Sequence, residues 1–323
     1  MRLRRGSKPR TRILFATDLH GSDVVLRKFL NAARIYEADI AILGGDLTGK
    51  KLVPIVESNG GWVASIAGEE RRVNGADDLA EIEAGIRNLG HYPVVVDRDE
   101  YMRLEEDADV LAEVFERECE RQVDSWMKLA ADRLEPQGIP LYVTGGNDDL
   151  MSVEPIIEQA PYVTGAEGRV TLIAPEVEMI SSGYSNPTPW NCPRDISEEE
   201  LGAKVEAMVE QLEDVQRAVF NLHVPPVESG LDQCARLDTS VSPPRPIVGE
   251  EISAGSTAVR NAIEKYAPLL SLHGHIHECR GVQRIGRTTC VNPGSEYGEG
   301  VLRSAVVDLA PEPNDLNVQL LSA

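Results

Sequence analysis

Leu269-Leu270-Ser271-Leu272-His273-Gly274-His275-Ile276-His277 gathers three of the six histidines of the chain within five positions. The leucines predict a short buried strand that ends at His273, and Gly274 allows the backbone to turn sharply there. We expect His275 and His277 to suit two adjacent metal ions better than one, whereas a histidine pair on a helix would need a spacing of three or four. The alternative is a solvated polar turn, although packing alone has no use for so many histidines.

The composition and charge of the 323-residue chain limit its function. Aromatic residues make up only 5% of the sequence within a hydrophobic fraction of 42%, which suits an α/β protein with Val- and Ile-rich strands. The formal net charge of −21 argues against nucleic acid or an anionic membrane as a partner, since an acidic field attracts neither. An anionic small molecule would need local positive charge, which bound metal ions supply.

The cysteines and the N-terminus indicate a cytoplasmic protein. Five cysteines, odd in number and far apart, form no C-x-x-C pair, so neither a disulfide framework nor a zinc knuckle is indicated. Residues 1–10 are basic, but the apolar run that follows is too short for the core of a signal peptide, and we interpret them as a flexible leader. No stretch approaches the length of a transmembrane helix.

Two strand-like runs near the N-terminus each end in an aspartate. Residues 12–17 predict a parallel strand that delivers Asp18 and His20 to the loop at its carboxyl end, where open α/β sheets place their ligands. An amphipathic helix and a second strand over 38–43, which leads to Asp46, complete a β-α-β unit. An aspartate after a strand often only caps a helix, so neither carboxylate is decisive alone.

Residues 50–135 differ in character from the segment that precedes them. The Asn59-Gly60 pair between two β-prone runs is a strong signal of a hairpin, and apolar residues at helical spacing follow over 77–90 and 101–134. Their Asp and Glu runs predict a solvated helix face. We interpret the region as an insertion within a single domain of residues 1–323, which packs beside the sheet or forms a homo-oligomer contact.

Beyond residue 135 the strand pattern returns and again ends in polar residues. A strand over 139–144 precedes Asn147, and a strand over 218–222 precedes His223. We further predict a hairpin over 170–182, a helix over 198–217, a long loop over 228–255, and strands over 301–309 and 316–321 that close a second sheet.

The strand ends supply two carboxylates, one amide and four imidazoles as candidate metal ligands. They are Asp18, His20, Asp46, Asn147, His223, His275 and His277. The set has the number and type of ligands for two divalent first-row cations with open positions for water and substrate, and the lack of thiolate tells against a structural zinc site. The ligand types do not decide between Mn, Fe, Ni, Co and Zn.

The ordered motifs Asp18-x-His20, Gly45-Asp46, Gly146-Asn147, His223 and Gly274-His275-x-His277 resemble the calcineurin-like metallophosphoesterase superfamily. The resemblance covers nearly all the chain outside residues 50–135, and it implies a four-layer α/β/β/α sandwich of two facing mixed sheets. It also implies which ligands act together: Asp18, His20 and His277 on the first metal ion, Asn147, His223 and His275 on the second, and Asp46 as the bridge. The stretches 18–22, 223–226 and 292–297 further resemble a prokaryotic branch of this superfamily.

The activity that the resemblance implies is that of a dinuclear metal-dependent phosphohydrolase acting on a small phosphorylated substrate. A metal-bridging hydroxide would attack phosphorus in line, while the two cations neutralise the phosphate oxygens within an otherwise acidic protein. We expect a slight preference for phosphodiesters, and a phosphomonoesterase is the alternative within this class. The alternative from another class is a non-catalytic metal-binding or protein-interaction scaffold on the same fold.

The chain departs from the family pattern where Gly-Asn-His-Asp/Glu becomes Gly146-Asn147-Asp148-Asp149. Asp148 thus replaces the histidine that commonly protonates the leaving oxygen or binds phosphate, and an ionised carboxylate beside dications would be a poor acid. We therefore expect a preference for good leaving groups, or proton donation from another group, for which His273 is nearest in the sequence. The alternative for His273 is a supporting, hydrogen-bonding role at the strand end.

Overall fold

The computed structural model describes residues 10–66, 68–309 and 316–323. The leader predicted over residues 1–10 lies, except for Arg10, outside these residues. The described part of the chain forms two six-stranded sheets, one four-stranded sheet and one two-stranded sheet. Among its helices, none combines the length and the apolar character needed to cross a membrane.

The first six-stranded sheet contains the strands of the N-terminal β-α-β unit. In the order of hydrogen-bonded neighbours it consists of β18 (Leu316–Ser322), β17 (Arg303–Leu309), β1 (Thr11–Ala16), β2 (Ile40–Leu43), β7 (Leu141–Val143) and β8 (Val163–Gly165). The strands from β1 to β8 run parallel, and β17 and β18 are antiparallel to their neighbours. The prediction that the last two strands close the second sheet is wrong, because alternation indicates a strand without indicating its partner: Ala305 pairs with Phe15 of β1.

The second six-stranded sheet is also mixed. It consists of β15 (Gly281–Ile285), β16 (Thr288–Asn292), β14 (Leu270–Leu272), β11 (Val219–Leu222), β10 (Val177–Ser182) and β9 (Val170–Ala174). The four central strands run parallel, and β15 and β9 are antiparallel edges. The hairpin predicted over residues 170–182 is therefore confirmed as β9 and β10.

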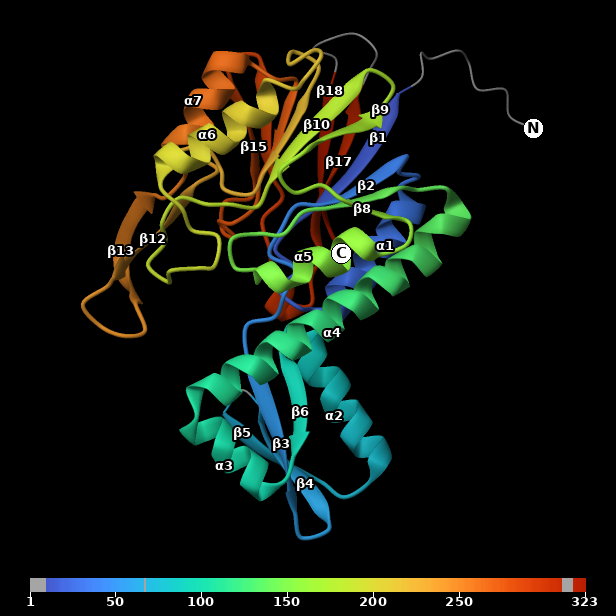
Figure 1. Ribbon diagram of the computed structural model, residues 1–323, viewed down its shortest axis with the longest axis vertical. Coiled ribbons are helices and arrows are strands. Elements are labelled where there is room, and N and C mark those ends of the chain that lie inside the picture. Colours follow the sequence, from blue (N-terminus) through green and yellow to red (C-terminus); the bar gives the residue numbers. More distant parts are fainter. Residues whose placement is uncertain (1–9, 67, 310–315) are drawn as a thin grey trace.

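Helices cover the outer face of each large sheet, as Figure 1 shows. The first sheet carries α1 (Asp23–Ile35), α4 (Ala108–Leu134) and α5 (Glu154–Gln159), and the second carries α6 (Glu198–Val209) and α7 (Thr257–Tyr266). Short 3₁₀ helices occupy Glu135–Gln137, Met151–Val153 and Tyr297–Glu299.

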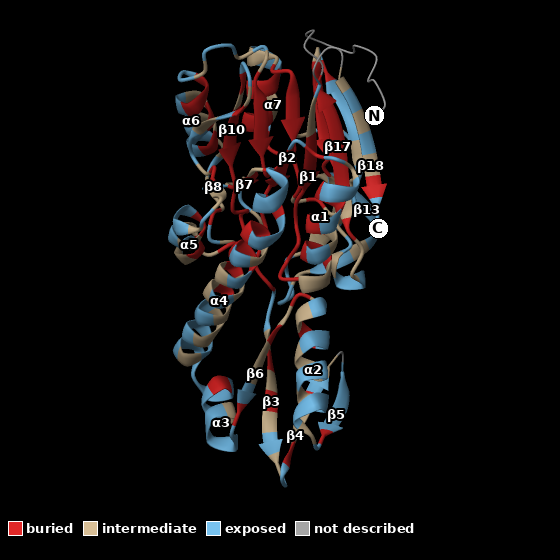
Figure 2. Ribbon diagram, turned by 90° about the vertical axis from the view of Figure 1, so that its right-hand side faces the viewer, coloured by how far each residue is buried: buried red, intermediate tan, exposed pale blue. Residues whose placement is uncertain are grey.

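Besides the cores between each large sheet and its helices, an apolar core lies between the two large sheets and joins them. Phe15 and Ile42 from the first sheet pack with Val219 and Leu272 from the second, and all four side chains are fully buried. Burial of each such side chain contributes about 2 kcal/mol. In Figure 2 the buried residues concentrate in the facing strands. The predicted fold class, a four-layer α/β/β/α sandwich of two mixed sheets, is confirmed.

A separate lobe stands below the two large sheets in Figure 1. It contains β5 (Glu69–Val73), β4 (Gly61–Ile66), β3 (Leu52–Ser58) and β6 (Tyr92–Val96), together with α2 (Ala76–Asn88) and α3 (Arg98–Glu106). The predicted Asn59-Gly60 hairpin is present, with Glu57 opposite Trp62. The lobe has a small core of its own around Val53, Ile55, Ala64 and Ile86.

The long helical stretch predicted over 101–134 is divided in two at Asp107. The Asp107 side chain accepts hydrogen bonds from the backbone N–H groups of Asp109 and Val110, so it caps the start of α4. From this point α4 runs along the first sheet, where Trp126 donates to Asp23 of α1 at 2.6 Å. The helix therefore ties the lower lobe to the main sandwich.

Two predicted elements differ from the structure. The helix predicted over 198–217 ends at Val209. Farther along, Asp214 accepts a hydrogen bond from the Gln216 N–H, and this local turn replaces the last part of the predicted helix. The loop predicted over 228–255 instead contains a hairpin of β12 (Gln233–Asp238) and β13 (Arg245–Ser253). Neither strand has a buried face, since β12 is half-buried along most of its length and β13 is largely exposed, so the alternation that marks a strand with one buried face is missing from the sequence.

Candidate metal centre

Loops at the carboxyl ends of five parallel strands converge at one edge of the sandwich. The first sheet delivers Asp18 after β1, Asp46 after β2 and Asn147 after β7. The second delivers His223 after β11, and the histidine-rich turn follows β14. Four of the seven predicted ligands adopt a positive φ: Asp18 (54°), His20 (40°), Asp46 (48°) and His275 (66°). Residues other than glycine rarely do so, and such strain is typical of functional loops.

One cluster brings Asp18, His20 and His277 together. Their ligand atoms all lie within 4.8 Å of one another. The Nε2 atoms of His20 and His277 are 3.0 Å apart, and the His277 Nε2 lies 3.4 Å from Asp18 Oδ1. Two ligand atoms on one first-row ion, each at about 2.1 Å and at roughly a right angle, are separated by about 3 Å. The cluster therefore has the spacing of a metal site.

A neighbouring cluster brings Asp46, His223 and His275 together, with ligand atoms again within 4.8 Å of one another. His223 Nε2 lies 3.4 Å from Asp46 Oδ1, and His275 Nδ1 lies 2.9 Å from Asn147 Oδ1. The other carboxylate oxygen of Asp46 lies 3.6 Å from His20 Nε2. Asp46 thus stands between the two clusters with one oxygen toward each.

The donor set and its unpaired nitrogen fit two divalent cations. Within the described part of the chain, His223 Nε2 in the second cluster is buried and lacks a hydrogen-bond partner. Such an orphaned nitrogen is costly unless a ligand satisfies it. Imidazole nitrogens with carboxylate and amide oxygens are the ligands that first-row cations accept.

Burial and mutual charge perturb the pKa values of the clustered groups. Burial opposes ionisation of Asp18, but hydrogen bonding to His277 and the charge of His223 outweigh it and lower its pKa to about 2. Burial likewise opposes protonation of His223, but the charge of Asp46 outweighs it and raises the pKa to about 9. Burial lowers the pKa of His275 to about 4. The clusters therefore offer ionised carboxylates to any bound cation.

Asp148 lies at the rim of the two clusters and pairs with Lys50. The Lys50 Nζ donates to Asp148 Oδ2, and both side chains are partly exposed. The same carboxylate oxygen lies 3.9 Å from His20 Nδ1. Burial tends to lower the pKa of Lys50, but the charges of Asp46 and Asp148 raise it overall. Lys50 therefore offsets the negative charge that Asp148 adds beside the two clusters.

His273 lies beneath the centre rather than at its surface. Its side chain is fully buried, and its Nδ1 lies 2.8 Å from the Leu222 carbonyl oxygen and 3.2 Å from that of Val224. Burial lowers its pKa to about 4. The neutral imidazole thus links the turn after β14 to the loop that carries His223.

The root of the lower lobe, meaning the segments around Lys50 and Gly90 where the lobe joins the main sandwich, borders the first cluster. On the side of the main sandwich, the ring of Tyr297, from the 3₁₀ helix Tyr297–Glu299, packs on the His20 ring at 4.7 Å between centroids. Gly90 has a φ of +78°, and a Cβ built on it would lie 2.1 Å from the His20 carbonyl oxygen. The Gly90 carbonyl also accepts from the Lys50 N–H at 3.2 Å. The lobe therefore packs closely against the loop that carries His20.

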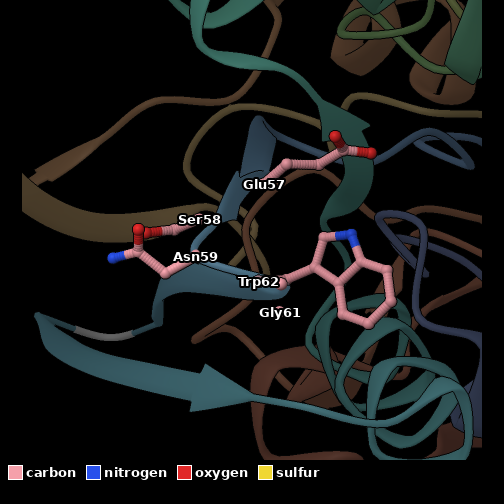
Figure 3. Close-up of a pocket in the computed structure, with 6 residues that line it drawn as sticks. Glu57, Ser58, Asn59, Gly61 and Trp62 are labelled. Atoms are coloured by element: carbon pink, nitrogen blue, oxygen red, sulfur yellow. The ribbon is translucent and has the colours of Figure 1, made fainter.

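The Asn59-Gly60 hairpin of the lower lobe lines a surface hollow of about 470 Å³. Figure 3 shows Glu57 and Trp62 pointing to the same side of this hairpin. None of the six residues that line the hollow belongs to the predicted metal ligands. The hollow is therefore separate from the metal-ligand clusters.

Sequence reasoning missed two residues beside the clusters, Lys50 and Asp195. Lys50 follows Asp46 by four positions in one loop, and this proximity is the available signal. Asp195 gives no such signal, because it is 48 residues from Asn147, whose amide nitrogen it binds at 3.0 Å. Only the fold brings these two side chains together.

Comparison with known proteins supports the fold. No model of a known protein family matches the chain. Over 119 residues the chain is 31% identical to an uncharacterized protein of Methanocaldococcus jannaschii, a match that covers 36% of this chain and 48% of that protein. The match thus spans about half the length of the curated relative.

Two solved structures align with nearly the whole chain. One is 18% identical with a TM-score of 0.57 and covers 97% of this chain and 99% of its own. The other, the protein TT1561 of Thermus thermophilus, is 14% identical with a TM-score of 0.50, and the alignment covers 96% of this chain and 99% of that protein. At these identities the likeness shows a shared fold, a layered α/β sandwich, and the chemistry must be argued from the site.

Proposed function

We propose that the chain is a metal-dependent phosphoric ester hydrolase of the calcineurin-like metallophosphoesterase superfamily, with a centre for two divalent ions. The observation that carries the proposal is the pair of buried ligand clusters on either side of Asp46. A carboxylate with one oxygen toward each cluster is what a shared ligand of two ions requires. The buried and unpaired Nε2 of His223, which faces Asp46, supports the proposal.

The roles that we propose follow the two clusters. Asp18, His20 and His277 hold one ion, Asn147, His223 and His275 hold the other, and Asp46 holds both. When bound, two such ions neutralise phosphoryl oxygens and lower the pKa of a water toward neutrality. The protein contributes rigidity, because the ligand loops leave strands of two sheets that share one packed core.

Lys50 and Asp148 face the open side of this centre, and we propose that they meet the substrate. The ammonium group of Lys50 is suited to a phosphate oxygen, and a carboxylate that accepts from Lys50 is a poor proton donor. We assign a supporting role to His273, because it is fully buried and held by two carbonyl oxygens. The centre therefore favours substrates with good leaving groups, with a slight preference for phosphodiesters over monoesters.

The lower lobe is the part of the chain that we propose to select the substrate. We take residues 50–135 as an insertion within one metallophosphoesterase domain of residues 1–323. Its root reaches the centre through Gly90 and through Lys50. A small phosphorylated compound that enters between the Lys50–Asp148 pair and Tyr297 would contact this root.

Metal analysis followed by paired assays tests the proposal. The purified protein is stripped with a chelator, reconstituted with Mn²⁺ and assayed on p-nitrophenyl phosphate and bis(p-nitrophenyl) phosphate. We expect two ions per chain and hydrolysis that the chelator abolishes. His223→Ala should lower the rate by about a hundredfold or more, because it removes a ligand outright.

His91→Gln is the matched control, since His91 lies outside both clusters, and it should retain the wild-type rate. Hydrolysis that persists in metal-free protein would contradict the proposal. Two bound ions without hydrolysis of either ester would favour the non-catalytic scaffold instead.

A further inference from the structure

We propose that Asp195 is a positioning residue for the metal centre: it fixes the side-chain amide of Asn147 so that the carbonyl oxygen faces the second cluster. The inference rests on the proposed metal centre. It extends that centre to the loop of residues 184–195, which contributes none of the seven predicted ligands.

The amide of Asn147 is engaged at both ends. Its Nδ2 donates to Asp195 Oδ1 at 3.0 Å, and its Oδ1 lies 2.9 Å from His275 Nδ1. The side chain is almost fully buried. An ionised carboxylate only accepts hydrogen bonds. Asp195 can therefore bond to the NH₂ group of the Asn147 amide but not to its carbonyl oxygen. The opposite orientation would turn that NH₂ group toward His275 and the proposed ion.

Asp195 is itself held in place by its own loop. Its Oδ2 accepts from the Thr188 N–H at 2.9 Å, from the Thr188 hydroxyl at 2.5 Å and from the Cys192 N–H at 3.0 Å. These three donors fill one carboxylate oxygen and leave Oδ1 for Asn147. The Asp195 carboxylate therefore has a fixed orientation, and its hydrogen bond with Nδ2 fixes the orientation of the Asn147 amide.

The loop is also fastened to the segment that carries Asn147. The Arg194 backbone N–H donates to the Asn147 carbonyl oxygen at 3.1 Å. The guanidinium of Arg194 is fully buried, donates to the Asp149 carbonyl oxygen at 3.1 Å and pairs with Glu154 at 2.5 Å. Movement of Asp195 away from Asn147 would therefore disturb the contacts of the neighbouring Arg194, including its partly buried ion pair with Glu154.

Metal titration of an isosteric variant tests the proposal. Asp195→Asn keeps the shape, and its amide oxygen can still accept from the three donors of the loop, so its NH₂ group faces the NH₂ group of Asn147 and no longer holds that amide in one orientation. In calorimetric titrations of metal-stripped protein with Mn²⁺, we expect one site with wild-type affinity and one weakened about 10- to 100-fold. Trp190→Ala, an exposed change in the same loop, should bind both ions as the wild type does.

Thr188→Val provides a second, milder variant that removes one donor to Asp195 and leaves the Asn147 contact in place. It should weaken the same site by about threefold to tenfold, and it decides the question if Asp195→Asn does not fold without metal. The proposal would be overturned if the folded Asp195→Asn variant binds both Mn²⁺ ions with wild-type affinity. If Asp195→Asn does not fold, the same result in Thr188→Val would overturn it. These titrations need no substrate, so a failure of the proposed hydrolase activity would show separately, as two bound ions without turnover.

Discussion

Lys50 and Asp148 form an ion pair at the rim of the two metal-ligand clusters, with Nζ of the lysine against Oδ2 of the aspartate. The two residues come from different loops, 98 positions apart in the sequence. Asp148 would otherwise add a negative charge beside the buried carboxylates of Asp18 and Asp46. The lysine offsets that charge, and after burial, which is the largest cause, its ammonium group helps to lower the pKa of His20.

The first prediction concerns Lys50 as a contact for the substrate phosphate. Lys50→Met removes the positive charge, so the Michaelis constant for p-nitrophenyl phosphate should rise about tenfold or more, because a charge-assisted hydrogen bond to phosphate is lost. Lys50→Arg should retain most of the affinity. Steady-state kinetics with Lys51→Met as the neighbouring control would measure the change.

An unchanged Michaelis constant in Lys50→Met would show that the lysine serves only to neutralise Asp148. The double variant Lys50→Met with Asp148→Asn separates these two roles. If Lys50 contacts substrate directly, removing the carboxylate as well does not restore the affinity.

The second prediction concerns Asp148 as the residue that limits the leaving group. Asp148→His places an imidazole where the chain now has a carboxylate, so the rate on an alkyl phosphate should rise about tenfold or more relative to the rate on an aryl phosphate. General acid catalysis typically contributes about 10²–10⁴-fold, and aryl leaving groups need it least. Assays of wild type and variant on matched alkyl and aryl esters, with metal content verified, would measure the ratio. An unchanged ratio would mean that Asp148 does not set the leaving-group preference.

The strands that carry the centre could be predicted because each leaves a local signal. Apolar runs such as the one that precedes Asp18 indicate buried parallel strands, and the polar residue at each carboxyl end follows directly. The histidine-rich turn after Leu272 gives the same signal more strongly. Periodicity does not supply the pairing of strands, and the prediction for β17 therefore named the wrong sheet.

The supporting residues could not be predicted, because their roles depend on contacts between distant segments. Asp195 resembles any loop aspartate until the fold brings it to Asn147. The hairpin of β12 and β13 was not predicted for a different reason: neither strand has a fully buried face, so burial imposes no alternating pattern on the sequence. The sequence therefore indicates which polar residues gather at the carboxyl ends of the strands, but not the residues from distant segments that contact them.

The third prediction concerns Gly90, where the lower lobe approaches the loop that carries His20. Gly90→Ala should destabilise the protein by about 2 kcal/mol or more, since a Cβ would meet the His20 carbonyl oxygen and the backbone φ is +78°. Gly60→Ala is the matched control, because its φ is +81° and its surroundings are open. Denaturant unfolding of the two variants isolates the cost of the close approach.

The same Gly90→Ala variant should weaken binding of one Mn²⁺ ion, because His20 moves with its loop. Equal losses of stability in Gly90→Ala and Gly60→Ala would mean that the contact with the His20 carbonyl is unimportant. If Gly90→Ala is destabilised but binds Mn²⁺ with normal affinity, the contact at Gly90 contributes to the stability of the protein and not to the geometry of the metal centre.

The fourth prediction concerns the pH dependence of stability at Glu167. Burial raises the pKa of this carboxyl group from 4.5 to about 7, although its Oε2 accepts from the Gly183 N–H at 2.7 Å. The folded protein therefore binds this proton more tightly than the unfolded chain does. The contribution to stability is complete below about pH 4.5 and is lost as the pH rises to about 7.

Glu167→Gln removes this titration, because the amide oxygen can still accept from Gly183 and carries no charge at any pH. The variant should be more stable than the wild type by about 2 kcal/mol at pH ~8, and the two should converge near pH ~4. Urea unfolding at a series of pH values would measure the difference, with the exposed Glu113→Gln as control. A difference that stays constant across this pH range would show that Glu167 titrates normally, and that the loop after β8 gives its carboxylate enough water or positive charge to ionise.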